Sequence, residues 1–311
     1  MDLRQLRTFV HVAELQSISA AAERLHIAQP ALSRQIQALE QELQARLLHR
    51  HGRGVTLTDA GALVRDRAEL ILREVARLQG DIRSQDGQLR GALSLGLPPT
   101  VAAVLATPLI ERTHLHHPDV KLKVVSGFSG HVQDWIQRGV VDLGVTYEGR
   151  EPAAIKSRPL LQEELFLIER PARDAPRRPG TGPALSRQAA FARDLILPSG
   201  SHGLRNIVEK AARESGLALK IVLENDSLPT LVQLVKRGLG ATILPLVSVF
   251  DEVRDGSLQA FAMVEPPLTR RLLLSRPIDR PTTPLARQFA DMLVEEIGAL
   301  VRQGRWPGTV L

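Results

Sequence analysis

Four polar side chains near the start of the chain have the types and the spacing needed to read the bases of DNA. Gln29, Ser33, Arg34 and Gln37 recur at intervals of three or four residues, which places them on one face of a helix. Amide and guanidinium groups form paired hydrogen bonds with base edges in the major groove, which is wide enough for a helix. The same pattern also fits an ordinary helical bundle whose polar face meets only water.

Three short helices are predicted to position this face. Residues 3–14 carry one apolar stripe, and Ser19 can cap a second helix over residues 20–25. Pro30 suits the first turn of a third helix, where an N–H group has no partner within the helix. The buried side of that helix is predicted to consist of Leu32, Ile36, Leu39 and Leu43. This is a helix-turn-helix whose outer face consists of Gln29, Pro30, Ser33, Arg34 and Gln37.

A basic segment follows the third helix and contains no acid before Asp59. Gly52 and Gly54 allow a tight hairpin, and residues 55–57 alternate like a short strand. A basic hairpin beside such a helix is typical of a winged helix-turn-helix, in which the wing touches the DNA backbone or the minor groove. The expected wing contacts are Arg50 and Arg53.

The next predicted helix, which Thr58 can cap, has apolar residues at a spacing of four and three over nearly three heptads. This spacing is typical of a helix that pairs with a copy of itself. Such pairing presents two recognition helices to a two-fold DNA site. The stripe could instead pack on the core of its own chain. The predicted dimer seam consists of Val64, Ala68, Ile71, Val75, Leu78 and Ile82.

From Leu89 onward, short apolar strands alternate with helices, which favours α/β lobes with a parallel sheet. Two such runs of similar plan predict a two-lobed clamp like that of periplasmic binding proteins. The predicted domains are 1–58 (winged helix-turn-helix), 59–89 (linker helix), 90–162 with 268–303 (first lobe), 163–267 (second lobe) and 304–311 (a mobile tail).

Ligands of α/β folds bind beyond the carboxyl ends of the strands, against helix N-termini. Hydroxyl groups and free helix N–H groups at these places favour a small anion, such as a carboxylate. Each Ser or Thr could instead be a plain helix cap. The predicted ligand-binding residues are Pro99, Thr100, Val101, Phe128, Ser129, Ser199, His202 and Ser227.

The composition restricts the class of protein. A net charge of +6 and a pI of about 10.2 allow a nucleic-acid partner. The chain has no cysteine, which removes disulfides and thiolate catalysis. No window is long and apolar enough to predict a membrane span or a signal peptide, so we expect a cytoplasmic protein. We expect no metal site and no cofactor.

Residues 2–65 closely resemble the DNA-binding segment of LysR-type transcriptional regulators. The resemblance rests on "FVHVAELQSISAAAERLHIAQPALSRQIQALEQELQARLLHR" followed by "GVTLTDAG". It implies that Gln29, Pro30, Ser33 and Arg34 face DNA, that Arg53 lies in the wing, and that Thr100 binds the effector. Ala28 stands where the family often has a capping Ser, and Gln44 stands where a Gly is common.

The resemblance implies a transcription factor that binds promoter DNA as a dimer or tetramer and responds to a small effector, with RNA polymerase as a further partner. Two other classes of protein remain to be considered. One is a solute receptor without sequence-specific DNA recognition; a basic wing and the absence of an export signal argue against it. The other is an enzyme, but the sequence offers no nucleophile–base pair or metal ligand set.

Overall fold

The computed structural model of the chain describes residues 1–52, 54–83, 89–149, 152–172, 180–200 and 202–311. The chain forms two compact units, Met1–Asp86 and Gly87–Leu311, each with its own core. Of the predicted site residues, Arg53 and the side chain of Ile82 lie outside the described part.

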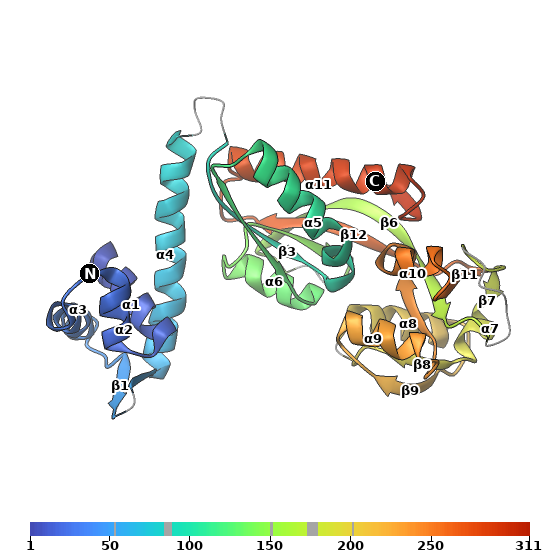
Figure 1. The fold of residues 1–311 in the computed structure, drawn as a ribbon, viewed down its shortest axis with the longest axis horizontal. Coiled ribbons are helices and arrows are strands. Elements are labelled where there is room, and N and C mark those ends of the chain that lie inside the picture. The colour runs from blue at the N-terminus through green and yellow to red at the C-terminus, as the bar shows by residue number, and fades with distance from the viewer. Residues whose placement is uncertain (53, 84–88, 150–151, 173–179, 201) are drawn as a thin grey trace. The chain divides into compact units, whose positions relative to one another are not determined.

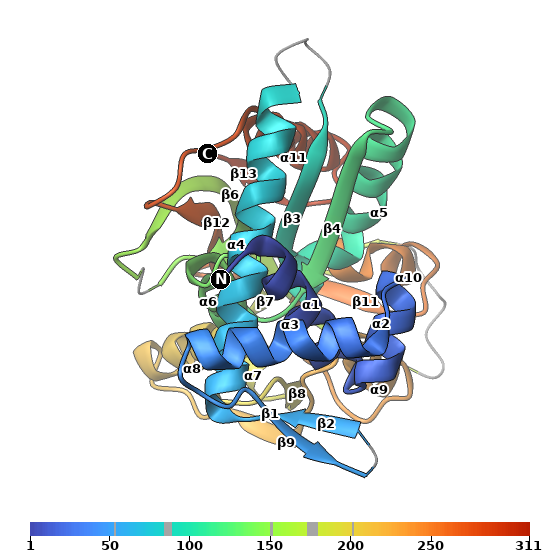
Figure 2. The same ribbon diagram turned by 90° about the vertical axis from the view of Figure 1, so that its left-hand side faces the viewer.

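The N-terminal unit begins with three helices: α1 (Leu3–Leu15), α2 (Ile18–Leu25) and α3 (Gln29–Glu42) (Figures 1 and 2). Ser17, not the predicted Ser19, caps α2, since its hydroxyl accepts from the Ala20 amide at 3.2 Å. Helix α3 has Pro30 in its first turn, and Ala28 precedes it without a side-chain cap. Both features of α3 were predicted from the sequence.

One face of α3 closes the core of this unit. Leu32, Ile36 and Leu39 are fully buried, as predicted, whereas Leu43 is 36% exposed because it lies at the C-terminal end of the helix. The Thr8 hydroxyl donates to the Gln35 side chain at 2.7 Å, which ties α1 to α3. Burial on one side and this hydrogen bond fix the rotation of α3 about its axis and leave its opposite face outward.

A hairpin of β1 (Leu48–His51) and β2 (Gly54–Leu57) projects from the helices. The Glu40 carboxylate accepts from the Leu47 amide at 2.8 Å and so holds the turn that enters the hairpin. Within that turn Gln44 adopts a left-handed conformation with φ 50°, so the turn forms without glycine. The Thr58 hydroxyl accepts from the Gly61 amide at 2.9 Å and caps α4 (Asp59–Arg83), as predicted.

The first lobe of the second unit is a mixed sheet with helices on its faces. Its parallel strands are β3 (Gly91–Leu97), β4 (Val120–Ser126) and β5 (Leu143–Tyr147), which alternate with α5 (Pro99–His116) and α6 (Ser129–Gln137). A parallel sheet was predicted, but the observed sheet is mixed. Strand β12 (Thr269–Pro277) returns from the second lobe and pairs antiparallel with β5.

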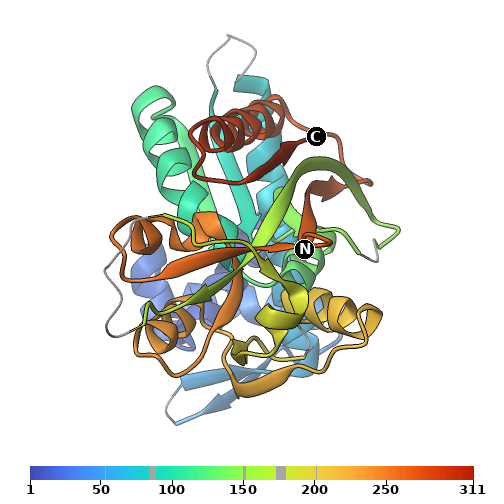
Figure 3. The ribbon, with the colours of Figure 1, turned by 90° about the vertical axis from the view of Figure 1, so that its right-hand side faces the viewer.

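Strand β6 (Ile155–Glu169) belongs to both lobes (Figure 3). Its first part pairs with β12, and its last five residues pair with β10 (Thr242–Pro245) and β11 (Gln259–Val264) of the second lobe. One long strand therefore joins two separate cores.

The second lobe also contains the parallel pair β8 (Asp194–Leu197) and β9 (Lys220–Glu224), which are followed by α8 (Gly203–Glu214) and α9 (Leu228–Lys236). Its shorter elements were not predicted; they are β7 (Leu185–Ser186), α7 (Arg187–Phe191), η2 (Leu246–Val249) and α10 (Phe250–Arg254).

The C-terminal segment is part of the first lobe. Helix α11 (Pro284–Arg302) packs on the core of that lobe, and β13 (Gly308–Val310) pairs antiparallel with β6. Between them, Trp306 is only 1% exposed. The prediction of a mobile tail from Gly304 is therefore wrong, because a buried indole and a strand pairing fix the segment.

Candidate functional site

The outer face of α3 carries the residues predicted to meet DNA. Gln29, Pro30, Arg34 and Gln37 are exposed and Ser33 is half-buried. Within the described residues no carboxylate pairs with Arg34, so its guanidinium is available to a partner. A polar face on a helix with a fixed rotation has the chemistry needed for base readout in a major groove.

The hairpin adds a second cationic surface to the same unit. Arg50 is exposed on β1, opposite Val55, whose side chain is buried in the core of the unit. Its exposure leaves the Arg50 guanidinium accessible to a phosphate of DNA.

The apolar stripe of α4 divides into two parts. Ala68 is 1% exposed and packs, with the half-buried Val64, on the core of its own unit. Ile71 and Leu78 are 40% and 61% exposed, and Val75 is half-buried. The members of the predicted seam that are exposed in the single chain are therefore Ile71 and Leu78.

In the second unit, the N-terminal ends of four helices from both lobes meet at one cavity. The first turns of α5, α6, α8 and α9 contribute Pro99, Ser129, Gly203 and Leu228 to its wall. Three of these helices, α5, α6 and α9, lack a side-chain cap in the described structure, so their amide groups are open to a ligand. The rule that places ligands beyond strand ends thus predicted the right region.

The predicted ligand-binding residues do not all reach this cavity. Pro99, Thr100, Phe128, Ser129 and His202 line it. Val101 is instead buried in the core of the first lobe, because the helical turn points it away from the cavity. Ser199 and Ser227 do not line the wall; the Ser199 hydroxyl donates to Asp226 at 3.0 Å, and the Ser227 hydroxyl accepts from Thr230 at 3.0 Å.

A buried charged cluster that the sequence did not reveal lies beneath Thr100. Arg270 of β12 forms an ion pair with Glu163 of β6, and both side chains are almost fully buried. The Trp306 indole donates to Glu163 at 2.6 Å, while the second guanidinium nitrogen of Arg270, Nη2, donates to the Thr100 hydroxyl at 3.0 Å. Thr100 also shares a hydrogen bond of 2.8 Å with the Tyr147 hydroxyl.

The surroundings of this cluster fix its protonation states. Burial raises the pKa of Tyr147 to about 12, so the phenol keeps its proton. Burial alone would lower the pKa of Arg270, but Glu163 and Tyr147 raise it above the ordinary value. The Arg270 guanidinium also lies 3.9 Å from the centre of the Tyr147 ring. Thr100 and Tyr147, which line the cavity, therefore keep their protons and lie over a charged guanidinium that does not itself line it.

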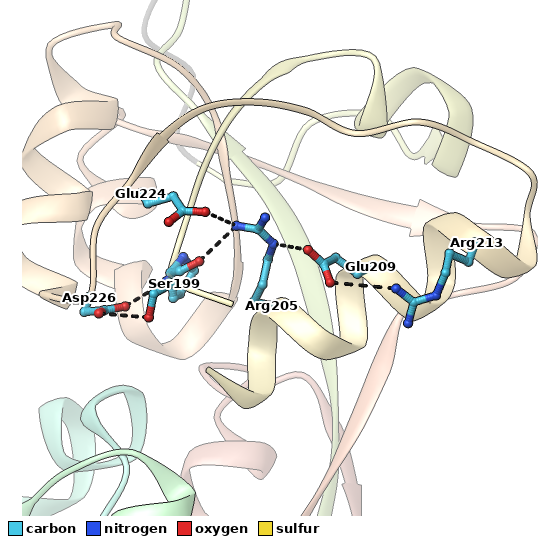
Figure 4. A network of polar contacts seen from close by, with 7 residues as sticks. Ser199, Arg205, Glu209, Arg213, Glu224 and Asp226 are labelled. Atoms are coloured by element: carbon cyan, nitrogen blue, oxygen red, sulfur yellow. Dashed lines mark hydrogen bonds and ion pairs between the residues drawn. The ribbon is translucent and has the colours of Figure 1, made fainter. Parts of the chain in front are cut away.

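On the opposite lobe, Arg205 fixes the loop that carries the second wall (Figure 4). Its guanidinium donates to the Pro198 carbonyl and to Glu224, each at 3.1 Å, and to Glu209 at 2.6 Å. Asp226 accepts from the Ser199 amide at 2.8 Å as well as from its hydroxyl. The loop after β8 and the loop after β9 are therefore held together at the cavity.

His202 connects the two lobes. Its ring packs edge-on against Phe128 with 4.4 Å between ring centres, and its Nδ1 accepts from the Leu204 amide at 3.0 Å. Burial, followed by the charge of Arg270, lowers the pKa of His202 to about 4, although Asp226 acts in the opposite direction. His202 is therefore neutral at neutral pH, with its proton on Nε2.

This pKa predicts a pH dependence of stability. In the unfolded chain His202 takes up a proton below its ordinary value of 6.5, whereas the folded chain resists protonation down to about 4. The unfolded state binds more protons in that window, so the free energy of unfolding falls as the pH falls from 6.5 to 4. We expect a contribution on the order of 1 kcal/mol, since His202 is partly exposed to solvent.

Urea unfolding followed by tryptophan fluorescence checks this expectation. Asn is the matched replacement, because it can still cap α8 but does not titrate. The His202→Asn protein should lose less stability than the wild type between pH 6.5 and pH 4. Identical losses in the two proteins would show that His202 titrates normally.

The polar face of α3, the basic hairpin and the two-lobed cavity together define a DNA-binding regulator with an attached ligand-binding domain. Residues 3–62 match the family model described as bacterial regulatory helix-turn-helix protein, lysR family, and residues 86–298 match the LysR substrate binding domain. The chain therefore belongs to the LysR-type transcriptional regulators, which are DNA-binding regulators and not enzymes.

Relatives match nearly the full length of the chain. It is 37% identical to the nitrogen assimilation regulatory protein nac of Klebsiella aerogenes over 79% of this chain and 78% of that protein. It is 30% identical to nac of Escherichia coli, strain K12, over 98% of each chain. It is also 30% identical to the transcriptional regulator BbuR of Bordetella bronchiseptica, over 99% of this chain and 94% of that one.

Solved structures of full-length regulators share the fold. CbnR in complex with its target DNA superposes with a TM-score of 0.73 and 23% identity, over 95% of this chain and 100% of that chain. A form of Corynebacterium glutamicum OxyR with bound hydrogen peroxide gives a TM-score of 0.62 and 27% identity, over 97% and 96% of the two chains. Among the described residues of the present chain, no helix is long and apolar enough to cross a membrane.

Proposed function

We propose that this regulator binds an inverted repeat in promoter DNA as a dimer, or as a dimer of dimers, through the outer face of α3 and the hairpin. The exposed apolar residues of α4, Ile71 and Leu78, support self-association. RNA polymerase is the further partner, since a promoter-bound regulator acts on transcription. The protein acts in the cytoplasm, where its DNA partner is found.

We propose further that a small carboxylate binds between the lobes and changes how the dimer holds DNA. The observation that carries this proposal is the convergence of four helix N-termini above a buried Arg270, three of them without a side-chain cap among the described residues. Helix N-termini and a guanidinium both stabilise an anion. A ligand that contacts both lobes would bind one arrangement of them better than another, which is the requirement for a ligand-driven switch.

Thr100→Val tests the position of the effector. Valine keeps the shape of threonine, a residue that lines the cavity, but removes the hydroxyl that contacts Arg270 and Tyr147. We expect carboxylate affinity to fall by about 1–2 kcal/mol, roughly tenfold, as measured by calorimetry, with affinity for promoter DNA unchanged. Thr230→Val is the control, because that hydroxyl contacts Ser227 and does not line the cavity. Equal carboxylate affinity in the Thr100→Val and wild-type proteins would place the ligand elsewhere.

A further inference from the structure

The two lobes present opposite charges to a ligand that binds in two adjoining cavities, since Arg270 lines one and Asp226 lines the other. The first lobe has a buried guanidinium nitrogen that needs a hydrogen-bond acceptor, and the second lobe has a carboxylate that no cation of the described residues neutralises. From this pairing we propose that the effector is a zwitterion of the α-amino acid class, held by its carboxylate on the first lobe and by its ammonium group on the second. This inference rests on the proposed ligand function of the cleft.

On the first lobe, one nitrogen of the Arg270 guanidinium lacks a hydrogen-bond acceptor among the described residues. Its Nε is paired with Glu163 and its Nη2 with Thr100, but its Nη1 is buried without a hydrogen-bond partner in the described structure. A buried, unpaired guanidinium N–H is unfavourable by about 1–3 kcal/mol, which an added acceptor would recover. Glu163 is already held by Arg270 and Trp306, so a ligand carboxylate is the natural partner for Nη1.

Asp226, which is exposed to solvent, offers a carboxylate to a cation at the edge of the small cavity. Its two oxygens accept from the amide and the hydroxyl of Ser199, which leaves further lone pairs for a donor in the cavity that Asp226 lines. No Lys or Arg side chain of the described residues pairs with Asp226. His202, which lines the same cavity, is neutral at neutral pH and cannot supply a positive charge.

A ligand with only one charged group meets only one of these demands. A plain carboxylate would satisfy Arg270 but would leave Asp226 without a cation, and a plain amine would leave Nη1 unpaired. An α-amino acid carries both groups on one carbon and satisfies both lobes. Arg205 holds the loops that position Asp226 (Figure 4), so the ammonium subsite is formed before the ligand binds.

The cavity that Asp226 lines is too small to hold an amino acid by itself, with a free volume of only about 30 Å³. The ligand would therefore also occupy the space next to it. A second cavity of about 930 Å³ adjoins it and shares Phe128, Ser129 and Tyr147 as lining residues. Arg270 lines this larger cavity and not the smaller one, so the ligand carboxylate would approach it from the larger cavity.

Calorimetry of the full-length protein with the twenty standard L-amino acids tests the proposal. Each amino acid that binds is compared with its desamino acid, in which hydrogen replaces the amino group, and with its decarboxylated amine. We expect at least one amino acid to bind, and both analogues to bind about tenfold or more weakly. Asp226→Asn should remove the preference over the desamino acid, whereas Thr100→Val should weaken the amino acid and the desamino acid alike.

Three results would overturn the proposal. Desamino acids that bind as tightly as the amino acids would remove the ammonium subsite while leaving the carboxylate function intact. An unchanged preference in the Asp226→Asn protein, with tryptophan fluorescence showing a native fold, would exclude Asp226 as the ammonium partner. Failure of every amino acid and desamino acid to bind at about 10 mM would contradict the ligand function of the cleft itself.

Discussion

Replacing Glu163 by Leu should destabilise the effector domain by about 3–5 kcal/mol, because it leaves Arg270 charged and buried without its counter-ion. The Arg270 and Glu163 side chains are 1% and 0% exposed, so water cannot take the place of the lost partner. The substitution also removes the acceptor of the Trp306 indole N–H. Urea unfolding followed by tryptophan fluorescence measures the loss in this domain alone, because both tryptophans, Trp135 and Trp306, belong to it.

The double variant Glu163→Leu with Arg270→Met separates the unpaired charge from a general packing defect. Removal of both charges should recover a large part of the lost stability, since an apolar pair of similar size often replaces a buried ion pair without a penalty. A double variant as unstable as the single one would show that the ion pair is not the cause. A loss below about 1 kcal/mol in the single variant would show that water reaches Arg270.

The second large effect is expected on α4. Ile71→Asp together with Leu78→Asp should weaken self-association by at least about 4 kcal/mol, roughly a thousandfold, because each subunit would bury unpaired carboxylates at the seam. Both side chains are exposed in the single chain, so the fold of the N-terminal unit should not change. Analytical ultracentrifugation measures the association, and a DNA duplex with two half-sites should lose affinity in parallel.

Ala76→Asp is the matched control for the seam. It introduces the same carboxylate at an exposed position of α4 that lies outside the apolar stripe, so the association of this variant should resemble that of the wild type. Dimers of normal strength in the Ile71→Asp, Leu78→Asp protein would move the subunit interface away from α4.

Local sequence signals predicted the DNA-binding unit well. The buried face of α3, its Pro30 start and the Thr58 cap all follow from spacing and residue type over a few positions. The error at α2 has the same local origin, since Ser17 and Ser19 are both acceptable caps and the hydrogen bond to Ala20 decides for Ser17. Local propensity narrows a helix start to a few residues, and the tertiary structure selects among them.

The site was predicted only in part, because the charged cluster beneath Thr100 is built from residues far apart in the chain. Strand ends and helix starts predicted Thr100, Ser129 and His202 as lining residues. The pair of Arg270 and Glu163 spans 107 positions, and nothing in either local segment indicates that the two meet. Trp306 was likewise assigned to a mobile tail, although the strand that follows it pairs with β6.

Binding of duplex DNA by the wild-type and Arg34→Ala proteins, measured by fluorescence anisotropy at about 100 mM salt, tests most directly whether the outer face of α3 reads base sequence. The duplex comes from the promoter region upstream of the protein's own gene, and a scrambled duplex of equal composition gives the non-specific affinity. Arg4→Ala, an exposed arginine of α1, controls for the loss of one positive charge. We predict that Arg34→Ala weakens binding to the promoter duplex by about 1–3 kcal/mol, with little change on the scrambled one. Equal affinity of the wild-type protein for both duplexes, or an Arg34→Ala protein that still separates them fully, would contradict the assignment of α3 as the reading helix.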